Sequence, residues 1–393
     1  MPQLIQLQVP AGTSAFEAAP TGNRYTADIN GYVYVQPNDV LSLLADGCIP
    51  FSGNLGNNFR NVLDGGDFSI NPFQRNIPGL ATAGVINTAI AATPTYFADR
   101  WFAAGGASSS ILMAAVADTS VPGFTTDLKV QRQAANTNTA QINFGQVLES
   151  ADVYRLQGQN VTFSFWAKAG ANFSAANSTL GVQIVSGTGL NQSVATLLAS
   201  GWTGQTNLPL TANGASVTSQ ALTTGMVRYS FQATVPLAAT QLAVLLNYVP
   251  VGTAGSDDSF YVNGLQLEVG ANAAPFEHRD VQVELEIAQR YAWVIAEPAA
   301  NSTIGSGYCT GASAQMFNIA TPVQLRTIPT LTTSAGTLKV HTNGAPVATG
   351  AITTAATVNS LTINTAATSG ATGQGCTLVG GGGSGYIVAS ADY

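Results

Sequence analysis

Residues 161–169 read Val-Thr-Phe-Ser-Phe-Trp-Ala-Lys-Ala, and this stretch decides the fold class. Large apolar side chains occupy every second position, which is the period of a β-strand. The residues predicted to share one face are Val161, Phe163, Phe165 and Ala167. Trp166 falls on the opposite face, among Thr, Ser and Lys side chains. We therefore expect a strand with one face in an apolar core.

The surrounding residues, 57–280, contain many short β-like segments that Gly, Asn, Pro and Ser interrupt. Residues 242–248 predict a strand buried on both faces, and residues 260–269 predict the last long strand. Almost no helical period occurs in this region. The pattern favours a two-sheet β-sandwich with a jelly-roll topology over residues 57–280.

The flanking regions predict three further parts. In residues 1–56, Asn30-Gly31 indicates a hairpin over 25–35, and Asp39 is expected to cap a short helix over 40–46, so that a small α+β module results. Residues 52–60 are a plausible linker. Apolar residues at helical spacing predict one helix from Asp280 to about Val294, within a connecting segment 281–296. Residues 297–393 are rich in Thr, Ala and Gly and predict a C-terminal β domain.

The composition points to a β-rich extracellular or virion protein. Charged residues make up 8% of the chain and apolar residues 46%, whereas ordinary soluble proteins carry roughly 25% charged residues. The formal net charge is −7 and no basic run occurs, so nucleic acid is not an expected partner. No apolar run of about 18 residues predicts a membrane span. The start of the chain lacks the pattern of an export signal.

Several short motifs in one order resemble a known family. They are NVLDGGDFSI at 61–70, FQR at 73–75, FADRW at 97–101, FGQVLE at 144–149, GLQLEVG at 264–270, PFEHR at 275–279 and QRY at 289–291. Their order and wording resemble the carbohydrate-binding-like jelly-roll domain of bacteriophage tail fibres and other virion appendages. The resemblance covers more than half of the chain.

The resemblance implies a structural protein on the virion surface, assembled in the host cytoplasm. It implies a short fibre or spike, which is either a tail fibre or a head fibre or capsid decoration protein. Such a protein is expected to form a homotrimer, to bind other virion proteins through residues 1–56 and to contact host-surface glycans. Two other functions stay open, namely a secreted carbohydrate-binding adhesin and a fibre-borne polysaccharide depolymerase. The absence of an export signal disfavours the adhesin.

Glycan binding requires exposed aromatic faces with hydrogen-bonding neighbours. Trp202 lies in a loop between two glycines and is the preferred ligand candidate. Trp166 projects away from the predicted core, and Tyr248 and Tyr261 are two further candidates. The alternative for Trp166 is a buried structural position. Trp101 is expected in the core.

Other chemistry has little support in the sequence. Asp257 and Asp258 are a weak candidate for a calcium site, with an acidic turn as the alternative, and no other cofactor is expected. His278 and His341 are isolated, and the three cysteines are expected to be buried free thiols, so no transition-metal site is predicted. A glycosidase would need two carboxylates. The candidates are Asp64, Asp67, Asp99, Asp118, Asp127, Glu149, Asp152, Asp257, Asp258, Glu268 and Glu277. Their proximity to Arg75, Arg100 and Arg279 favours structural ion pairs, and no catalytic residue is expected.

Overall fold

The computed structural model describes two compact units, residues 1–60 and residues 61–393. The described parts of the first are 5–8, 15–17, 21–27, 32–35, 39, 43, 49–50 and 59–60. The described parts of the second are 61–68, 83–87 and 94–392, without 107, 298–300, 334–337, 343, 351, 368–369 and 382–384.

The first unit contains two small antiparallel sheets. One has the order β4-β1-β5, built from β1 (Ile5–Gln8), β4 (Tyr32–Val35) and β5 (Ile49–Pro50). The other pairs β2 (Ala15–Glu17) with β3 (Arg24–Thr26). The predicted hairpin over 25–35 is therefore wrong, because β3 and β4 pair with different strands. The Asn30-Gly31 turn, most of the predicted helix over 40–46 and most of the linker lie outside the described residues.

Asp39 binds side chains on and beside β3, whereas most of the helix that it is predicted to cap lies outside the described residues. Its carboxylate is buried and accepts hydrogen bonds from Thr21 Oγ1 at 2.6 Å, Asn23 Nδ2 at 2.9 Å and Tyr25 OH at 2.5 Å. Hydrogen bonds from Thr21, Tyr25 and Asn23 lower the pKa of this carboxyl. Asp39 thus holds the chain around β3.

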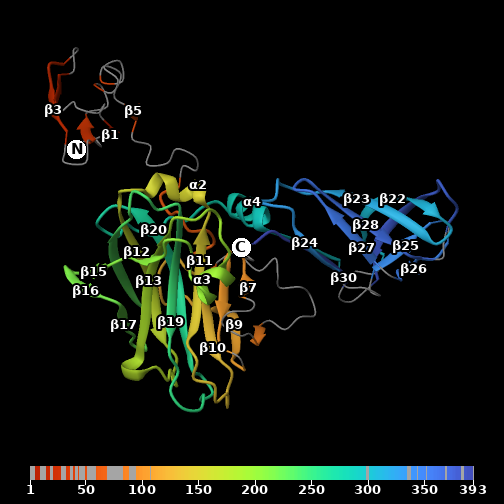
Figure 1. The fold of residues 1–393 in the computed structure, drawn as a ribbon, viewed down its shortest axis with the longest axis horizontal. Coiled ribbons are helices and arrows are strands. Elements are labelled where there is room, and N and C mark those ends of the chain that lie inside the picture. The colour runs from red at the N-terminus through yellow and green to blue at the C-terminus, as the bar shows by residue number, and fades with distance from the viewer. Residues whose placement is uncertain are drawn as a thin grey trace. The chain divides into compact units, whose positions relative to one another are not determined.

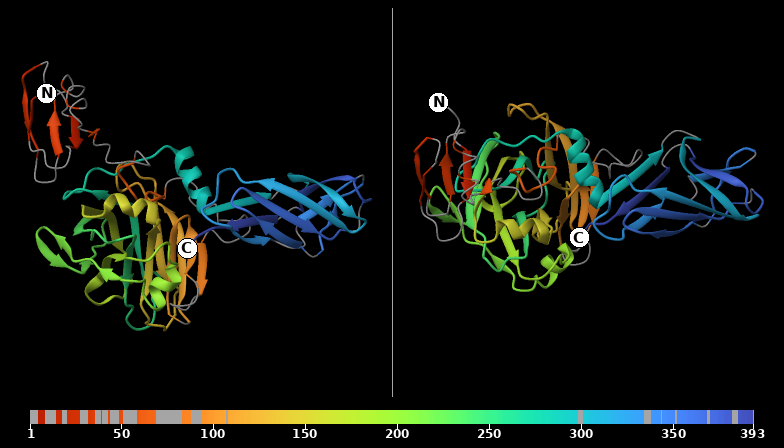
Figure 2. Two further views of the ribbon diagram at one scale, coloured as in Figure 1. Left: turned by 45° about the horizontal axis from the view of Figure 1, so that its top comes forward. Right: turned by 90° about the horizontal axis from the view of Figure 1, so that it is seen from above.

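The second unit begins with a β-sandwich of two antiparallel sheets that lie face to face (Figures 1 and 2). The first has the described order β16-β15-β18-β12-β20-β10-β9-β6. Its strands are β6 (Ala83–Asn87), β9 (Ser110–Ala117), β10 (Thr126–Arg132), β12 (Asn160–Ala169), β15 (Leu210–Ala212), β16 (Ala215–Val217), β18 (Val227–Thr234) and β20 (Ser259–Val269). We call it the eight-stranded sheet.

The opposing sheet has the described order β14-β13-β19-β11-β8-β7, with β17 also paired to β13, and we call it the seven-stranded sheet. Its strands are β7 (Thr95–Ala98), β8 (Trp101–Ala104), β11 (Ile142–Leu148), β13 (Thr179–Gly187), β14 (Thr206–Asn207), β17 (Ser219–Ala221) and β19 (Gln241–Tyr248). Short helices join the strands: α2 (Ser150–Val153), η2 (Tyr154–Leu156), η3 (Ala176–Ser178) and α3 (Val194–Ala199). This is the predicted jelly-roll sandwich.

The core between the sheets confirms the alternation of residues 161–169. Val161, Phe163, Phe165 and Ala167 are all fully buried and belong to one continuous apolar cluster. The Phe165 ring stacks on Phe231 of β18, with 5.8 Å between centroids. The predicted strand over 242–248 is β19, which is buried on both faces because a second apolar cluster covers its outer side. Trp101 is fully buried, as predicted.

Helix α4 (Val281–Tyr291) follows the sandwich and begins at Asp280, whose side chain accepts a hydrogen bond from the Gln282 amide. The predicted end near Val294 is wrong. The helix ends at Tyr291, and β21 (Ala292–Glu297) continues directly from it. β21 pairs along its whole length with β30 (Gly385–Ser390), about ninety residues later, and this pairing overrides the local helical spacing.

The C-terminal β domain contains two antiparallel sheets around a second core. One has the order β21-β30-β24, with β24 (Thr330–Thr333). The strands of the other, in the described order β26-β25-β29-β22-β23-β28-β27, are β22 (Thr303–Gly311), β23 (Ala314–Ala320), β25 (Leu338–His341), β26 (Val347–Ala348), β27 (Ile352–Ala356), β28 (Ser360–Thr365) and β29 (Gly375–Gly380). Cys309 and Cys376 are buried free thiols in this core, whereas Cys48 lies outside the described residues.

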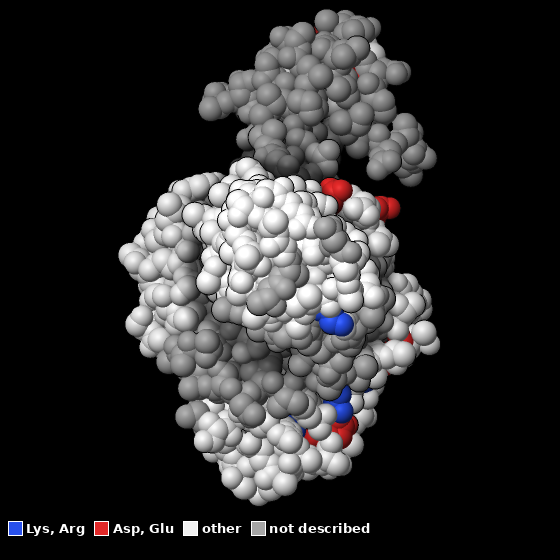
Figure 3. Space-filling model, turned by 90° about the vertical axis from the view of Figure 1, so that its right-hand side faces the viewer, with Lys and Arg blue, Asp and Glu red and all other residues white. Residues whose placement is uncertain are grey.

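The surface keeps the charge-poor character of the sequence. Figure 3 shows one face of the molecule, on which charged side chains are few and scattered. No helix in the described part of the chain is long and apolar enough to cross a membrane. Residues other than Lys, Arg, Asp and Glu therefore supply most of the described part of that face.

Candidate functional site

The outer side of the eight-stranded sheet carries two cross-strand rows of polar and aromatic side chains. In the first row, Trp166 on β12 is paired with Asn263 on β20 and Arg228 on β18. Asn263 continues the row to β10 by donating a hydrogen bond to Asp127 at 3.2 Å, and both of these side chains are buried. The second row places Tyr261 between two lysines. We call these residues the polar-aromatic face: Asp127, Lys129, Trp166, Lys168, Arg228, Tyr261 and Asn263.

In the second row, Tyr261 on β20 is paired with Lys129 on β10 and Lys168 on β12. The lysine Nζ atoms lie 5.4 Å and 4.9 Å from the centroid of the tyrosine ring. Neighbouring strands are about 4.8 Å apart and alternate residues about 7 Å apart, so the two rows form one continuous surface. The tyrosine and both lysines are half-buried.

Nearby carboxylates neutralise the lysines of the polar-aromatic face. Lys129 pairs with Asp257 at 2.7 Å. Lys168 contacts Asp118 directly and lies 3.4 Å from Asp127. The hydrogen bond from Lys168 lowers the pKa of Asp118, whereas burial and the adjacent Asp118 raise that of Asp127 to about 6. The face is thus locally balanced in charge and suits a neutral ligand better than a polyanion.

Trp166 is held from the side by the sheet itself. Gly264 has a φ of +58°, and a Cβ there would lie 2.8 Å from Phe124 Cζ and 3.2 Å from Trp166 Cδ1. The register between β12 and β20 shifts next to this glycine, between Ser164 and Trp166. Phe124 is buried against the Phe276 ring, with 5.2 Å between centroids. Trp166 is therefore fixed in position while remaining partly accessible to solvent.

The other two aromatic candidates do not lie on this face. Trp202 is 4% exposed, and its indole Nε1 donates a hydrogen bond to the Ser193 carbonyl at 3.0 Å. It packs with α3 onto apolar side chains on the outer side of the seven-stranded sheet, where α3 lies in Figure 1. Neither ring face is open for stacking on a sugar. The flanking glycines indicate a turn, but this turn folds onto the sheet.

Tyr248 is also buried, with 2% of its surface exposed. Its ring packs at 4.9 Å from Phe173 and 5.9 Å from Phe260 in the main core. Burial raises the pKa of its hydroxyl. The structure thus places Tyr248 between the sheets and corrects the prediction of an accessible ring. The sequence did not indicate Lys129 and Asn263, which only the strand register brings beside Tyr261 and Trp166.

Asp257 and Asp258 both bind protein groups. Asp258 is fully buried and accepts hydrogen bonds from Arg132 Nε at 2.8 Å and from the Ser174 amide at 2.8 Å. Asp257 pairs with Lys129 and accepts a hydrogen bond from the Ala171 amide at 2.9 Å. Among the described residues, no group of three or more His, Cys, Asp or Glu is arranged to hold a metal ion. The calcium site stays a sequence prediction, and this geometry adds no support to it.

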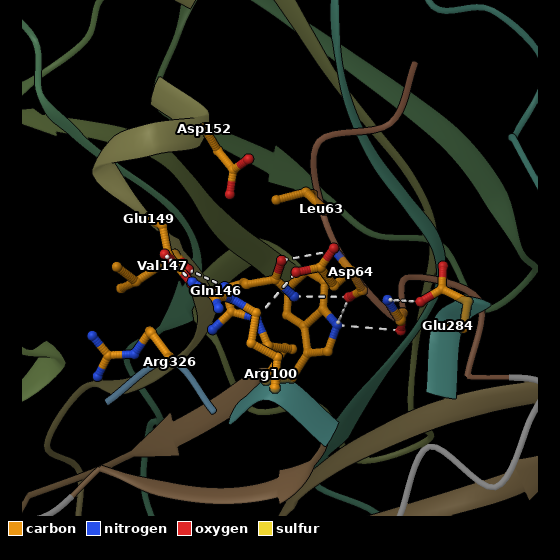
Figure 4. Close-up of polar contacts among 12 residues, drawn as sticks. Leu63, Asp64, Arg100, Gln146, Val147, Glu149, Asp152, Glu284 and Arg326 are labelled. Atoms are coloured by element: carbon orange, nitrogen blue, oxygen red, sulfur yellow. Dashed lines mark hydrogen bonds and ion pairs between the residues drawn. The ribbon is translucent and has the colours of Figure 1, made fainter. Parts of the chain in front are cut away.

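The sequence motifs meet in a network that Figure 4 shows. Asp64 lies between two buried guanidinium groups, 3.1 Å from Arg100 Nε and 3.2 Å from Arg279 Nη1. Its backbone exchanges two 2.8 Å hydrogen bonds with the Gln146 side chain. Arg100 Cζ lies 3.5 Å from the centroid of the Tyr291 ring. The motifs at 61–70, 97–101, 144–149 and 289–291 are thus joined, which confirms the predicted ion pairs of Asp64.

Helix α4 joins the same network through two acidic partners. Glu284 lies 3.2 Å from Arg279 and accepts a hydrogen bond from the Gly65 amide. Burial raises its pKa to about 7. Arg290 pairs with Glu149 at 3.1 Å, and the Arg290 carbonyl accepts a hydrogen bond from the Arg326 amide of the C-terminal domain. The network therefore connects the chain at Asp64 and Gly65 with the seven-stranded sheet and with α4.

The remaining glycosidase candidates have structural contacts in the described structure. Glu277 accepts a hydrogen bond from the Asn61 amide at 2.7 Å, and buried Glu268 accepts one from the Ala274 amide at 2.8 Å. Asp67 lies 3.4 Å from His278 Nδ1. Burial raises the pKa of Asp152 to about 6, and its carboxylate lies 3.7 Å from Arg155. Arg75 lies outside the described residues. These contacts assign no catalytic role to any candidate.

Comparisons with known proteins give only distant likenesses. No family model and no curated protein matches the chain. The enzymatically active domain of tailspike protein 4 of bacteriophage CBA120 is 12% identical with a TM-score of 0.28, and the match covers 54% of this chain and 22% of that one. The C-terminal family 22 carbohydrate-binding module of Clostridium thermocellum Xyn10B is 18% identical with a TM-score of 0.28, covering 44% and 89%. A family 4 carbohydrate-binding module is 17% identical with a TM-score of 0.27, covering 48% and 95%.

Likenesses this low carry no argument about function. The protein class that the described structure itself defines is a mainly β protein, in which a jelly-roll sandwich is followed by one helix and a C-terminal β domain. The polar-aromatic face is the candidate functional site of this protein.

Proposed function

We propose that the jelly roll binds a neutral glycan on its polar-aromatic face. The observation that carries this proposal is that Trp166, which is partly accessible, stands beside Arg228 and next to the Tyr261 row with its two lysines. The C–H groups of a sugar pack on an aromatic ring, while its hydroxyls need hydrogen-bonding partners. The face offers two aromatic rings, a guanidinium and two amines within two neighbouring rows.

The balanced charge of the face favours an uncharged ligand over a polyanion. Three cations, Lys129, Lys168 and Arg228, share this surface with the carboxylates of Asp118, Asp127 and Asp257. A polyphosphate chain would need a clustered positive surface, which these carboxylates cancel. A hydroxyl-rich, uncharged ligand gains from both signs of charge, because hydroxyl groups donate and accept hydrogen bonds.

Replacing Trp166 by alanine is expected to weaken glycan binding about tenfold or more, since a lost stacking contact plus its buried area is worth roughly 1.5–3 kcal/mol. The full chain is screened on an array of bacterial surface glycans, and the dissociation constant of the best ligand is measured by calorimetry. The control is Tyr154→Ala, because Tyr154 is an exposed aromatic residue of the same domain outside the face. Equal affinities of wild type and Trp166→Ala, with unchanged thermal unfolding, would refute the proposal.

We further propose that the chain is a bacteriophage virion surface protein, a short fibre or spike that uses this face on the host. The supports are the ordered motifs of residues 57–291 and the charge-poor composition. In this proposal the protein is a homotrimer on the virion surface, and residues 1–56 attach it to capsid or tail proteins. The two-unit division of the chain, with its first unit at 1–60, is compatible with a separate attachment module.

Deleting residues 1–56 is expected to abolish incorporation into virions, because the attachment contacts are removed while the sandwich core of residues 61–293 stays intact. Incorporation is measured by immunoblotting purified virions, with circular dichroism of the truncated protein as the folding control. Normal incorporation of the truncated protein would contradict the anchor. Gold-labelled antibody against residues 297–393 on intact virions then separates a head fibre or capsid decoration from a tail fibre. Absence from virions would favour a secreted adhesin.

A further inference from the structure

A cavity at the edge of the sandwich is separate from the polar-aromatic face. It has a volume of about 370 Å³ and opens between β13 and the chain that connects β14 to β17. We call it the edge groove. Its volume lies at the lower end of the roughly 300–1,000 Å³ that small-molecule sites occupy. The groove thus has room for a small ligand or for the terminal unit of a longer one.

The edge groove exists because the chain after β14 crosses from one sheet to the other. β13 pairs with β17 at Thr179–Gly181 and with β14 at Val185–Ser186. Between these ladders, residues 208–218 leave the seven-stranded sheet and pair with β18 of the eight-stranded sheet through β15. Two backbone hydrogen bonds fix the crossing, from Leu208 N to Ile184 O at 2.8 Å and from Val182 N to Thr218 O at 3.0 Å.

The lining of the edge groove has two chemical parts. Its inner part is aliphatic and continuous with the main core, and includes Val182 and Leu210, which are both buried. Its rim carries uncharged hydrogen-bonding side chains: half-buried Gln183, and exposed Asn207 and Ser216. No charged and no aromatic residue lines it.

We propose that the edge groove is a second sugar site, which takes an N-acetylated hexosamine. An aliphatic floor without an aromatic ring cannot stack a pyranose, but it can bury the methyl group of an acetamido substituent. The amides of Gln183 and Asn207 can donate to and accept from the acetamido group, and a neutral rim suits a neutral sugar. The ligand class follows the proposed glycan binding, while the site and its residues are different.

Saturation-transfer NMR of the full chain with the methyl glycosides of N-acetylglucosamine and of glucose tests the proposal. We expect transfer to be strongest at the acetamido methyl protons and at least tenfold weaker affinity for the glucoside. Ser216→Trp, which fills the groove, and Gln183→Ala should each weaken N-acetylglucosamine binding about tenfold. Ser219→Trp is the matched control, because Ser219 is an exposed serine on β17 that does not line the groove. Circular dichroism checks the fold of each variant.

Several results would overturn the second site. These are no binding, equal affinity for the two glycosides, or affinity that neither Ser216→Trp nor Gln183→Ala changes. A change in sedimentation of Ser216→Trp, with sugar binding intact, would instead assign the groove to a second copy of the chain. Trp166→Ala should leave N-acetylglucosamine binding unchanged. Failure of the groove and failure of the polar-aromatic face are thus distinguished by which variant loses which ligand.

Discussion

Asp258→Ala is expected to destabilise the jelly roll by about 3–5 kcal/mol, because it leaves a buried arginine without its counterion. Asp258 and Arg132 are both fully buried, with 2.8 Å between the carboxylate and Nε. Asp258 also accepts hydrogen bonds from the amide and hydroxyl of Ser174. Arg132 Nη1 donates to the carbonyls of Asn138 and Gly252. One ion pair therefore connects three chain segments, residues 132–138, the chain at Ser174 and residues 252–258.

The adjacent residue provides a matched control. Asp257 belongs to a partly exposed pair with Lys129, and such pairs contribute about 0–1 kcal/mol. Urea unfolding of both alanine variants should give a large fall in the midpoint for Asp258→Ala and a small one for Asp257→Ala. The double variant Arg132→Met with Asp258→Leu should recover much of the loss, since no buried charge is left unpaired. Equal destabilisation by the two single variants would show that the buried ion pair contributes no more to stability than the partly exposed one.

Asp64→Ala is expected to cost a similar amount, about 3–5 kcal/mol, because one carboxylate is the partner of two buried arginines. Its carboxylate contacts both Arg100 and Arg279, whose side chains are each 3% exposed. Alanine would leave Arg279 with Glu284 and the carbonyls of Asn61 and Leu63. It would leave Arg100 with the Tyr291 ring and the Val147 carbonyl. The loss should loosen residues 61–68 and α4 together, because both meet at this network.

Thermal and urea unfolding measure this effect, and hydrogen exchange of the α4 amides reports the loosening. Glu286→Ala is the control on α4, because Glu286 is exposed and outside the network, and surface changes of this kind stay within about 0.5 kcal/mol. Asp64→Asn should be intermediate, since it keeps the shape and removes the charge. If Asp64→Ala is as stable to unfolding as Glu286→Ala, the network around Asp64 does not stabilise the contacts between the sequence motifs.

The sequence predicted the parts of the fold that depend on local periodicity. The alternation of 161–169 assigns faces without any knowledge of partners, so the core positions Phe163 and Phe165 followed directly. The end of α4 was not predictable in this way, because the residues after Tyr291 pair with β30, a strand about ninety positions later in the chain. The hairpin over 25–35 failed for the same reason, since β4 pairs with β1 near the start of the chain rather than with β3.

The candidate site was only partly predictable. Alternation placed Trp166 on the outer side of its strand, and the structure agrees. Exposure of Trp202 was inferred from its glycines, but a turn says nothing about what the loop packs against. Tyr261 and Lys129 join Trp166 only through the register of three strands that are far apart in the sequence. Register depends on non-local pairing, which one sequence without a structure does not reveal.

The most direct test of the central claim is a crystal structure of the full chain with the best glycan from the array. We expect a sugar ring against Trp166, with hydroxyl groups hydrogen-bonded to side chains of the Tyr261 row, on the outer side of β10, β12 and β20. An N-acetylated unit in the edge groove would add the second site. A glycan bound elsewhere, with the polar-aromatic face empty, would refute glycan binding by this face.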